Sequence, residues 1–301
     1  MEQFFQQVAN GLSVGSTYAV VALGFGLTFS VMRVINLAHP ELFMLGAYLT
    51  GAVVTFLGFS SSTAPLAGAV GMLILVLMLV MAGTGATGLV IERFVIRPVR
   101  GRYILIPFMA TGGIAIFMQY GAQRIWGSDP EFVPSVIPFH AFWVGGVNIT
   151  SAQLTTFIAG IIVMFLLRYY VRETRWGRAT RAVAERADVA AACGVNVNFV
   201  SQLTVGISSM MAGIAGVTIG LLYTSAWPFM GLLYGLKAFV CMLVGGNRHI
   251  EAIMVIGLVL GIIEAMVTGY ITSTLRDAVA FSMLLGILVF RPNGLFGSYE
   301  V

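Results

Sequence analysis

The stretch from Thr174 to Asn196 is a long polar break in a chain that is otherwise dominated by apolar runs. Four of its charged side chains recur at helical spacing and would share one face of a helix: Arg178, Arg181, Glu185 and Asp188. Small apolar side chains would share another, shallow face: Ala179, Val183, Ala187 and Ala190. Gly194 then ends the run as a helix C-cap would. Such a helix suits docking into a groove on a cytoplasmic partner, although a solvated loop helix without a partner would show the same pattern.

Lys237, the only lysine of the chain, lies near the middle of the apolar run 229–246, and Glu264 lies just past the middle of the run 250–271. A short turn joins the two runs, so we expect two antiparallel neighbouring helices. With a rise of about 1.5 Å per residue, the two charges would differ in depth by roughly 4 to 8 Å. Each charge alone at mid-membrane costs about 2.5–3.5 kcal/mol on insertion scales, and pairing offsets that cost. The sequence therefore predicts a structural ion pair inside a helix bundle, with direct contact to a substrate as the alternative.

Three polar residues follow Arg33 at a point where an apolar run is interrupted: Asn36, His39 and Glu41. Asn36 is placed to cap the next helix, whose first turn would then hold Pro40 and Glu41, where a proline and an acid are favoured. This pattern predicts either a hinge or cavity-lining turn or an ordinary cytoplasmic turn.

Motifs of enzymes and metal sites are missing from the sequence. Neither the Walker A pattern of nucleotide-binding loops nor the zinc-binding HExxH occurs. The pattern GxSxG occurs at Gly11–Gly15, but inside an apolar run and not at a strand-to-helix turn. The histidines are scattered, and neither cysteine has metal-ligand neighbours. We therefore expect a protein without catalytic residues, cofactor or metal.

The composition indicates whether these residues lie in water or in a lipid bilayer. Hydrophobic residues make up 58% of the chain and charged residues 9%, with a mean hydropathy of +0.95, whereas soluble domains contain roughly 45–50% and 25%. We expect a polytopic membrane protein built of helices, because spanning segments must satisfy their own backbone hydrogen bonds. The runs lack the alternation of a transmembrane barrel. The net charge of +4 is carried by arginines in loops, which indicates membrane topology and no nucleic-acid binding.

Polar breaks divide the chain into nine apolar runs: 8–32, 36–58, 66–91, 103–126, 149–170, 198–223, 229–246, 250–271 and 275–290. The arginine-rich loops at 93–102 and 168–186 should be cytoplasmic, and the loop 129–148, which has no lysine or arginine, should lie outside. This predicts an all-α polytopic membrane protein of about nine helices, with a periplasmic N-terminus and a cytoplasmic C-terminus after Arg291. A break at 32–41 and the glycine- and proline-containing runs suggest broken helices, which would change the count by one or two. Residues 1–301 would form a single transmembrane domain with a cytoplasmic loop or helix at about 174–196.

Several segments carry a more specific resemblance: NLAHPE (36–41), MLGAY (44–48), IERFVIRPVRG (91–101), GLKAFVCMLVGG (235–246) and LLGILVFRPNGLFG (284–297). In order and spacing they resemble segments of permeases from branched-chain amino acid ABC importers, the LivH type. Pro40 stands where that family often has glycine, and NRHIE at 247–251 replaces glycine-rich sequence. A subgroup with a different substrate would show departures of this kind.

The resemblance implies a membrane permease subunit, without ATPase activity of its own, for branched-chain or other hydrophobic amino acids in the bacterial inner membrane. Such permeases carry a cytoplasmic EAAxxxG loop that docks on the ATPase, and here Asp188, Val189 and Ala190 stand three residues before Gly194. The implied partners are a second, LivM-like permease or another copy of this chain, two cytoplasmic ABC ATPase subunits and a periplasmic substrate-binding protein. Together they would work by alternating access.

A rival interpretation is a stand-alone ion-coupled secondary transporter or channel for a small organic solute. Such a protein would be expected to show an intramembrane acidic relay. Only Glu264 lies clearly in the middle of an apolar run, so this interpretation has less support.

Overall fold

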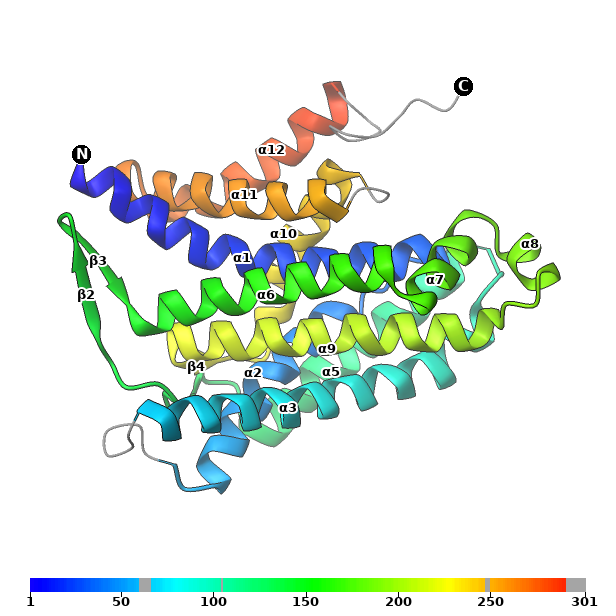
Figure 1. Cartoon of the computed structure of the whole chain (residues 1–301), viewed down its shortest axis with the longest axis horizontal. Helices are drawn as coiled ribbons and strands as arrows, with labels where there is room; N and C mark the ends of the chain where they lie inside the picture. The colour runs from blue at the N-terminus through cyan, green and yellow to red at the C-terminus, as the bar shows by residue number, and fades with distance from the viewer. Residues whose placement is uncertain (60–65, 104, 247–249, 291–301) are drawn as a thin grey trace.

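The computed structural model describes residues 1–59, 66–103, 105–246 and 250–290 (Figure 1). Within these ranges, six helical segments are long and apolar enough to cross a membrane. They comprise α1 (Glu2–Met32), α3 (Leu66–Ile91) with its short continuations η1 (Glu92–Ile96) and α4 (Arg97–Val99), α5 (Leu105–Trp126), α6 (Ser151–Glu173), α9 (Val197–Tyr223) and α11 (Ile250–Tyr270). The chain is therefore a mostly helical, multi-pass membrane protein, as its composition predicts.

Shorter elements complete the fold: α2 (His39–Phe56), α7 (Arg175–Glu185), α8 (Ala187–Ala192), α10 (Met230–Gly245), η2 (Ser273–Leu275) and α12 (Arg276–Phe290). Each of the nine predicted apolar runs thus contains a helix. The polar break at Ser60–Thr63, the NRH segment at 247–249 and the C-terminal Arg291 lie outside the described residues.

Four short strands add to the helices in the predicted outer loop and beside it. β2 (Ala141–Val144) and β3 (Val147–Thr150) form an antiparallel hairpin, and β1 (Glu131–Phe132) pairs with β4 (Ser225–Ala226). Gly145 and Gly146 both have positive φ, which a tight two-residue hairpin turn requires. The hairpin lies at the same end of the molecule as the N-terminus, and α7 and α8 lie at the opposite end (Figure 1).

Helix α1 occupies the centre of the bundle and contacts α6, α9, α10 and α11. Its closest approach is to α11, where glycines of the two helices face each other. A Cβ on Gly11 would come within 2.5 Å of Ile262 Cα, and one on Gly15 within 2.9 Å of the Gly257 carbonyl oxygen. Because lipid tails are as apolar as the helices, such backbone-to-backbone packing is a main source of helix association in a membrane.

Gly261→Ala is expected to destabilise the protein, because the added methyl group would overlap the backbone of both Gly11 and Gly15. Overpacking of this kind typically costs about 1–3 kcal/mol. Gly113→Ala on α5 is the matched control, since a Cβ there meets nothing within 4 Å. Thermal unfolding of the purified variants in detergent measures the difference. Equal midpoints for the two variants would contradict the close packing of α1 on α11.

Two long helices end in the same unusual way. Arg33 after α1 (φ 54°) and Thr224 after α9 (φ 51°) are the only non-glycine residues with positive φ in the described part of the chain. Each begins a connection of equal length, residues 33–38 and 224–229, that leads to a short helix. His39, the first residue of α2, hydrogen-bonds through Nε2 with the Val21 carbonyl oxygen of α1 (3.3 Å). The structure thus has the break that the sequence predicts near 32–41, and α2 begins beside the interior of α1.

The starts of the two short helices meet inside the bundle. Gly231 and Gly235 of α10 face the first turn of α2, where a Cβ on Gly231 would lie 2.7 Å from the Pro40 carbonyl oxygen, and one on Gly235 would overlap the Pro40 ring. Half-helices that begin within the membrane are tolerated where surrounding protein satisfies their backbone groups.

Candidate functional site

The structure brings Lys237 of α10 and Glu264 of α11 together. The Lys237 Nζ atom lies 2.9 Å from Glu264 Oε1, and the two side chains are only 6% and 1% exposed. The two residues therefore occupy the positions of the predicted intramembrane ion pair.

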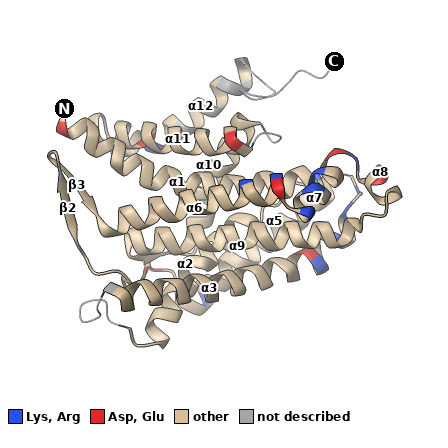
Figure 2. Cartoon of the chain, in the orientation of Figure 1, with Lys and Arg blue, Asp and Glu red and all other residues tan. Residues whose placement is uncertain are grey.

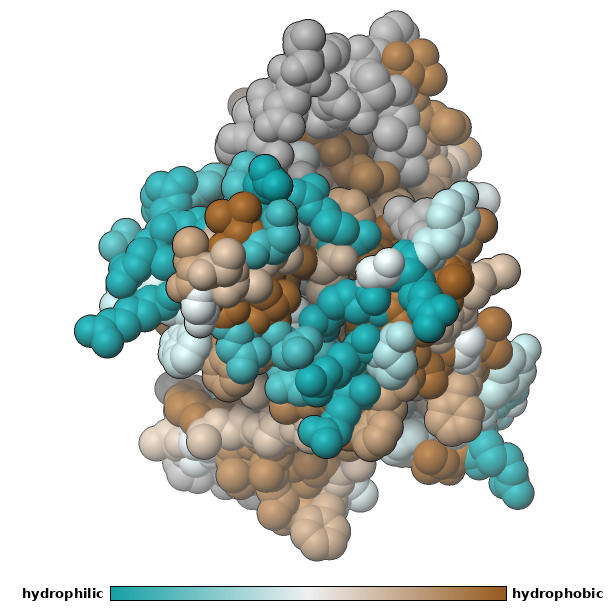
Figure 3. Space-filling model, turned by 90° about the vertical axis from the view of Figure 1, so that its right-hand side faces the viewer, coloured by the Kyte–Doolittle hydropathy of each residue, from teal (hydrophilic) through white to brown (hydrophobic). Residues whose placement is uncertain are grey.

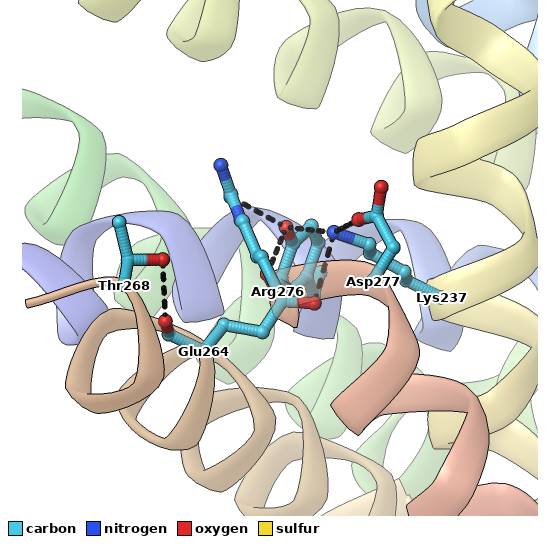
Figure 4. A network of polar contacts seen from close by, with 6 residues as sticks. Lys237, Glu264, Thr268, Arg276 and Asp277 are labelled. Atoms are coloured by element: carbon cyan, nitrogen blue, oxygen red, sulfur yellow. Dashed lines mark hydrogen bonds and ion pairs between the residues drawn. The ribbon is translucent and has the colours of Figure 1, made fainter. Parts of the chain in front are cut away.

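Two charged residues that the sequence analysis missed extend this pair into what we call the charge cluster: Lys237, Glu264, Arg276 and Asp277. Asp277 Oδ1 lies 2.7 Å from Lys237 Nζ, and Arg276 Nε lies 2.9 Å from Glu264 Oε2. The Tyr18 hydroxyl of α1 donates a hydrogen bond to Glu264 Oε2 (2.8 Å) and accepts one from Arg276 Nη2 (3.0 Å). Figure 4 shows the four charged side chains converging from three helices.

The charge cluster holds two cations and two anions, so their formal charges cancel. It connects α10, α11 and α12 to the central α1 through Tyr18. The available sequence signal was the doublet Arg276-Asp277 at the start of the last apolar run. Each of these residues on its own looks like an ordinary charge at a helix terminus.

Asn36, His39 and Glu41 are all buried, with exposed fractions of 2%, 0% and 1%. Asn36 is not the helix N-cap predicted above: that position is Ala38, whose backbone N–H donates to Asn36 Oδ1 (3.1 Å). Pro40 and Glu41 do lie in the first turn of α2, as expected. Glu41 Oε1 accepts a hydrogen bond from Gln119 Nε2 of α5 (2.8 Å). Burial of all three residues disfavours a solvated turn.

The segment at about 174–196, predicted above as a single helix, consists of two helices. The backbone at Arg186 is extended (φ −149°, ψ 103°), so α7 ends at Glu185 and α8 begins at Ala187. Arg178, Arg181 and Glu185 are exposed on α7. Asp188 belongs to α8, so it does not lie on the same helix face as these three residues. Arg186 instead donates a hydrogen bond to Asp188 (3.1 Å) and holds the pKa of that carboxyl below its ordinary value, so Asp188 is ionised at neutral pH.

The predicted shallow apolar face is also different from the expectation. Val183 and Ala190 are 3% and 4% exposed, so they pack against the rest of this chain and are not open to a partner, whereas Ala187 is exposed. The largest apolar side chain that α8 presents outward is Val189, which is 48% exposed. Any docking surface on α8 is therefore the side that carries Val189.

The predicted helix stop at Gly194 is confirmed. Gly194 has φ +85°, its N–H donates to the Ala191 carbonyl oxygen, and the Val195 N–H donates to the Ala190 carbonyl oxygen. This pair of hydrogen bonds is the Schellman arrangement, which favours glycine at the left-handed position.

Both ends of the segment α7–α8, which we call the coupling segment, are fixed to long helices. Thr174 ends α6 and starts α7, and its Oγ1 accepts the Gly177 N–H (2.9 Å). At the other end Asn196 Oδ1 accepts the Phe199 N–H (3.1 Å) and caps α9. Arg33, where α1 breaks, donates through Nη2 to the Ala184 carbonyl oxygen of α7 (2.9 Å). The coupling segment therefore contacts the chain at three long helices.

Charged residues gather around the coupling segment, while the long helices carry few (Figure 2). Seen from that end, hydrophilic residues spread over the middle of the face, and hydrophobic residues dominate its lower and right-hand margins (Figure 3). A bundle of apolar helices with one strongly basic end and a neutral charge cluster around a buried ion pair is typical of a polytopic membrane protein whose spans pack around polar groups.

Residues 7–289 match the family described as branched-chain amino acid transport system / permease component. The chain belongs to this family and is a permease subunit. It is 35% identical over 303 residues to the high-affinity branched-chain amino acid transport system permease protein BraD of Pseudomonas aeruginosa, covering 99% of this chain and 97% of that one. To the corresponding permease protein LivH of Escherichia coli K12 it is 34% identical over 308 residues, with the same coverage. The resemblance inferred from the sequence motifs is thereby confirmed.

A solved structure shares the fold at low sequence identity. It is PsaBC from Streptococcus pneumoniae in complex with Fab, with a TM-score of 0.52 and 13% identity, covering 95% of this chain and 92% of the other. The fold of this chain therefore resembles one already seen in a solved structure.

Proposed function

We propose that this chain is the membrane permease subunit of an ABC importer in the bacterial inner membrane that carries branched-chain or other hydrophobic amino acids. The observation that carries the proposal is the similarity over nearly the full length to BraD and LivH, which are named as permeases for branched-chain amino acids. No chemistry occurs in this chain. It supplies the path, and separate ATPase subunits supply the free energy.

The charge distribution supports one orientation. The end with the coupling segment carries most of the arginines (Figure 2), and cytoplasmic loops are enriched in arginine and lysine. The N-terminus and the β2–β3 hairpin then face the periplasm, where a substrate-binding protein would dock. With α2 and α10 as half-helices, the nine apolar runs correspond to fewer complete crossings.

The coupling segment is the proposed contact with the ATPase. The coupling segment is joined to α6 at Thr174 and to α9 at Asn196. If the ATPase displaced the coupling segment, both helices would therefore move with it. The hydrogen bond from Arg33 to Ala184 would pass the same displacement to the connection between α1 and α2. Those helices meet α10 in the interior, so one movement at the cytoplasmic end would change the packing around the half-helices and expose the path to alternate sides.

A second permease subunit is part of the proposal, either a LivM-like relative or another copy of this chain. Each of the two ATPase subunits would then contact the coupling segment of one permease subunit. The competing interpretation, an ion-coupled secondary transporter, would need an intramembrane acid that is free to carry protons, and Glu264 does not suit that role because it already contacts two cations.

Transport by this chain is expected to depend on an added ATPase. Proteoliposomes that hold the complete complex should accumulate L-leucine only when ATP is present on the ATPase side, and the purified chain alone should hydrolyse no ATP. The control is the same complex with an ATPase that cannot hydrolyse ATP. Accumulation of L-leucine by this chain alone under a sodium or proton gradient would refute the importer.

A further inference from the structure

A cavity of about 390 Å³ lies beside the charge cluster, in the half of the molecule that carries the N-terminus and the hairpin. Residues of α1, α6, α9, α11 and α12 line it, so it lies between helices that are distant in sequence. Its volume falls at the small end of the range for ligand pockets in proteins, roughly 300–1,000 Å³. The cavity is therefore of a size suited to a single small metabolite.

The charged groups of the wall restrict the net charge of a ligand. Glu264 and Arg276 both line the cavity and are paired with each other, and behind them Lys237 pairs with Asp277. The wall is therefore electrically balanced before a ligand enters. A ligand with net charge would leave one uncompensated charge next to Glu264, which is 1% exposed, and an unpaired charge at a buried group is costly. A neutral molecule, including a zwitterion, avoids that cost.

Arg276 retains hydrogen-bonding capacity that the cluster does not use. Its Nε contacts Glu264 and its Nη2 contacts Tyr18, whereas Nη1 makes no hydrogen bond to any residue the structure describes. Figure 4 shows the tip of Arg276 directed away from the other charged groups. A guanidinium edge with free donors is well suited to a carboxylate.

Side-chain amides form another part of the wall. Asn10 Oδ1 accepts a hydrogen bond from Gln153 Nε2 (2.8 Å), and Asn10 Nδ2 donates to Gln7 Oε1 (3.3 Å). Gln153 Oε1 accepts the Thr150 N–H (2.9 Å). An amide oxygen has two lone pairs, so the oxygens of Gln7 and Gln153 can each accept a further hydrogen bond. They offer acceptors for an ammonium group without adding charge.

Aliphatic groups also line the cavity: Val14, Leu222 and Ala265. We propose that this cavity binds a neutral zwitterionic amino acid with an aliphatic side chain. Its carboxylate lies on the free edge of Arg276, its ammonium faces the amide oxygens of Gln7 and Gln153, and its side chain lies against Val14 and Leu222. The inference rests on the proposed function, and it adds to that function a binding site and the groups that recognise each end of the substrate.

The test compares two variants on α11. Ala265→Phe places a ring in the cavity and removes no charged group, and Val255→Phe adds a ring to the outer face of the same helix, where Val255 is 53% exposed. Radiolabelled L-leucine is bound to the purified full-length chain in lipid nanodiscs. We expect saturable binding by wild type and by Val255→Phe, and binding at least about tenfold weaker by Ala265→Phe. Thermal unfolding confirms that both variants are folded.

Two analogues test the recognition of each end. 3-Methylbutylamine lacks the carboxylate and 4-methylpentanoic acid lacks the ammonium group, so each carries a net charge into the balanced cavity. Both should compete with L-leucine at least about a hundredfold more weakly than unlabelled L-leucine does. Competition by either analogue at the strength of L-leucine overturns the zwitterion site, and so does the absence of saturable L-leucine binding by wild type.

Transport measurements separate this inference from the proposed function. If the complete complex shows ATP-driven uptake of L-leucine that Ala265→Phe leaves unchanged, the cavity is not the site, although the importer stands. If the wild-type complex shows no ATP-driven uptake of L-leucine although the chain binds L-leucine in this cavity, the importer fails and the site stands.

Discussion

Lys237→Met is expected to lower the thermal stability of the protein strongly, and Glu264→Gln is expected to do the same. Each single change leaves the charge cluster with one excess charge, next to a side chain that is at most 6% exposed. Because Glu264 keeps Arg276 and Lys237 keeps Asp277 as a second partner, the loss should stay below about 3–5 kcal/mol, the cost for a buried ion pair that loses its only partner. In the double variant Arg276 and Asp277 remain as one cation and one anion, so the balance returns and much of the stability should return with it.

A double-mutant cycle measured by thermal unfolding in detergent tests this interaction. The surface pair of Arg168 and Glu251 serves as the matched control, because its atoms are similarly close (3.1 Å) while its side chains are 43% and 40% exposed. Glu251 also contacts Arg172, so this carboxylate has a second cation, as Glu264 does. Exposed pairs contribute only about 0–1 kcal/mol. If the effects of Lys237→Met and Glu264→Gln are additive, the two residues do not interact energetically. A coupling that is no larger than that of the control pair would equally argue against a buried cluster.

The helices could be located from the sequence because the physical signal is local. An apolar run bounded by polar residues has to be buried or in lipid, and its backbone has to be satisfied within the run, so a helix follows. Thus α3 begins and ends at Leu66 and Ile91, the bounds of the predicted run. The pairing of Lys237 with Glu264 was accessible for a related reason, since two costly charges on adjacent helices offset each other.

Two features that the sequence did not reveal, the break at Arg186 and the place of Arg276 in the charge cluster, depend on tertiary contacts. Nothing within 174–196 marks Arg186 as a break, because neither Arg186 nor either of its sequence neighbours is proline or glycine. The break lets α8 turn so that Ala190 is buried and α8 contacts α9, and such packing overrides local helix propensity. Likewise, Arg276 belongs to the charge cluster only because α12 begins beside α11 and α1, which requires the folded arrangement.

Val189→Lys is expected to abolish transport by the complete complex while leaving the permease folded. Val189 is the largest exposed apolar side chain of α8. A lysine at this position would have to bury its charge against the ATPase, which is costly and should break the contact. Since the position is 48% exposed in this chain, lysine is tolerated in the isolated permease. The purified variant should therefore unfold at the wild-type temperature but fail to retain the ATPase during affinity purification.

Two further variants show whether the effect belongs to the docking surface. Val189→Ile keeps an apolar group at the same position and should preserve both ATPase retention and transport. Ala190→Trp places a large ring where the wild-type side chain is 4% exposed, so overpacking should lower the stability of the permease itself. Normal ATPase retention and transport by Val189→Lys would show that the ATPase docks elsewhere. Loss of folding by Val189→Lys would show instead that the outward side of α8 is needed within this chain.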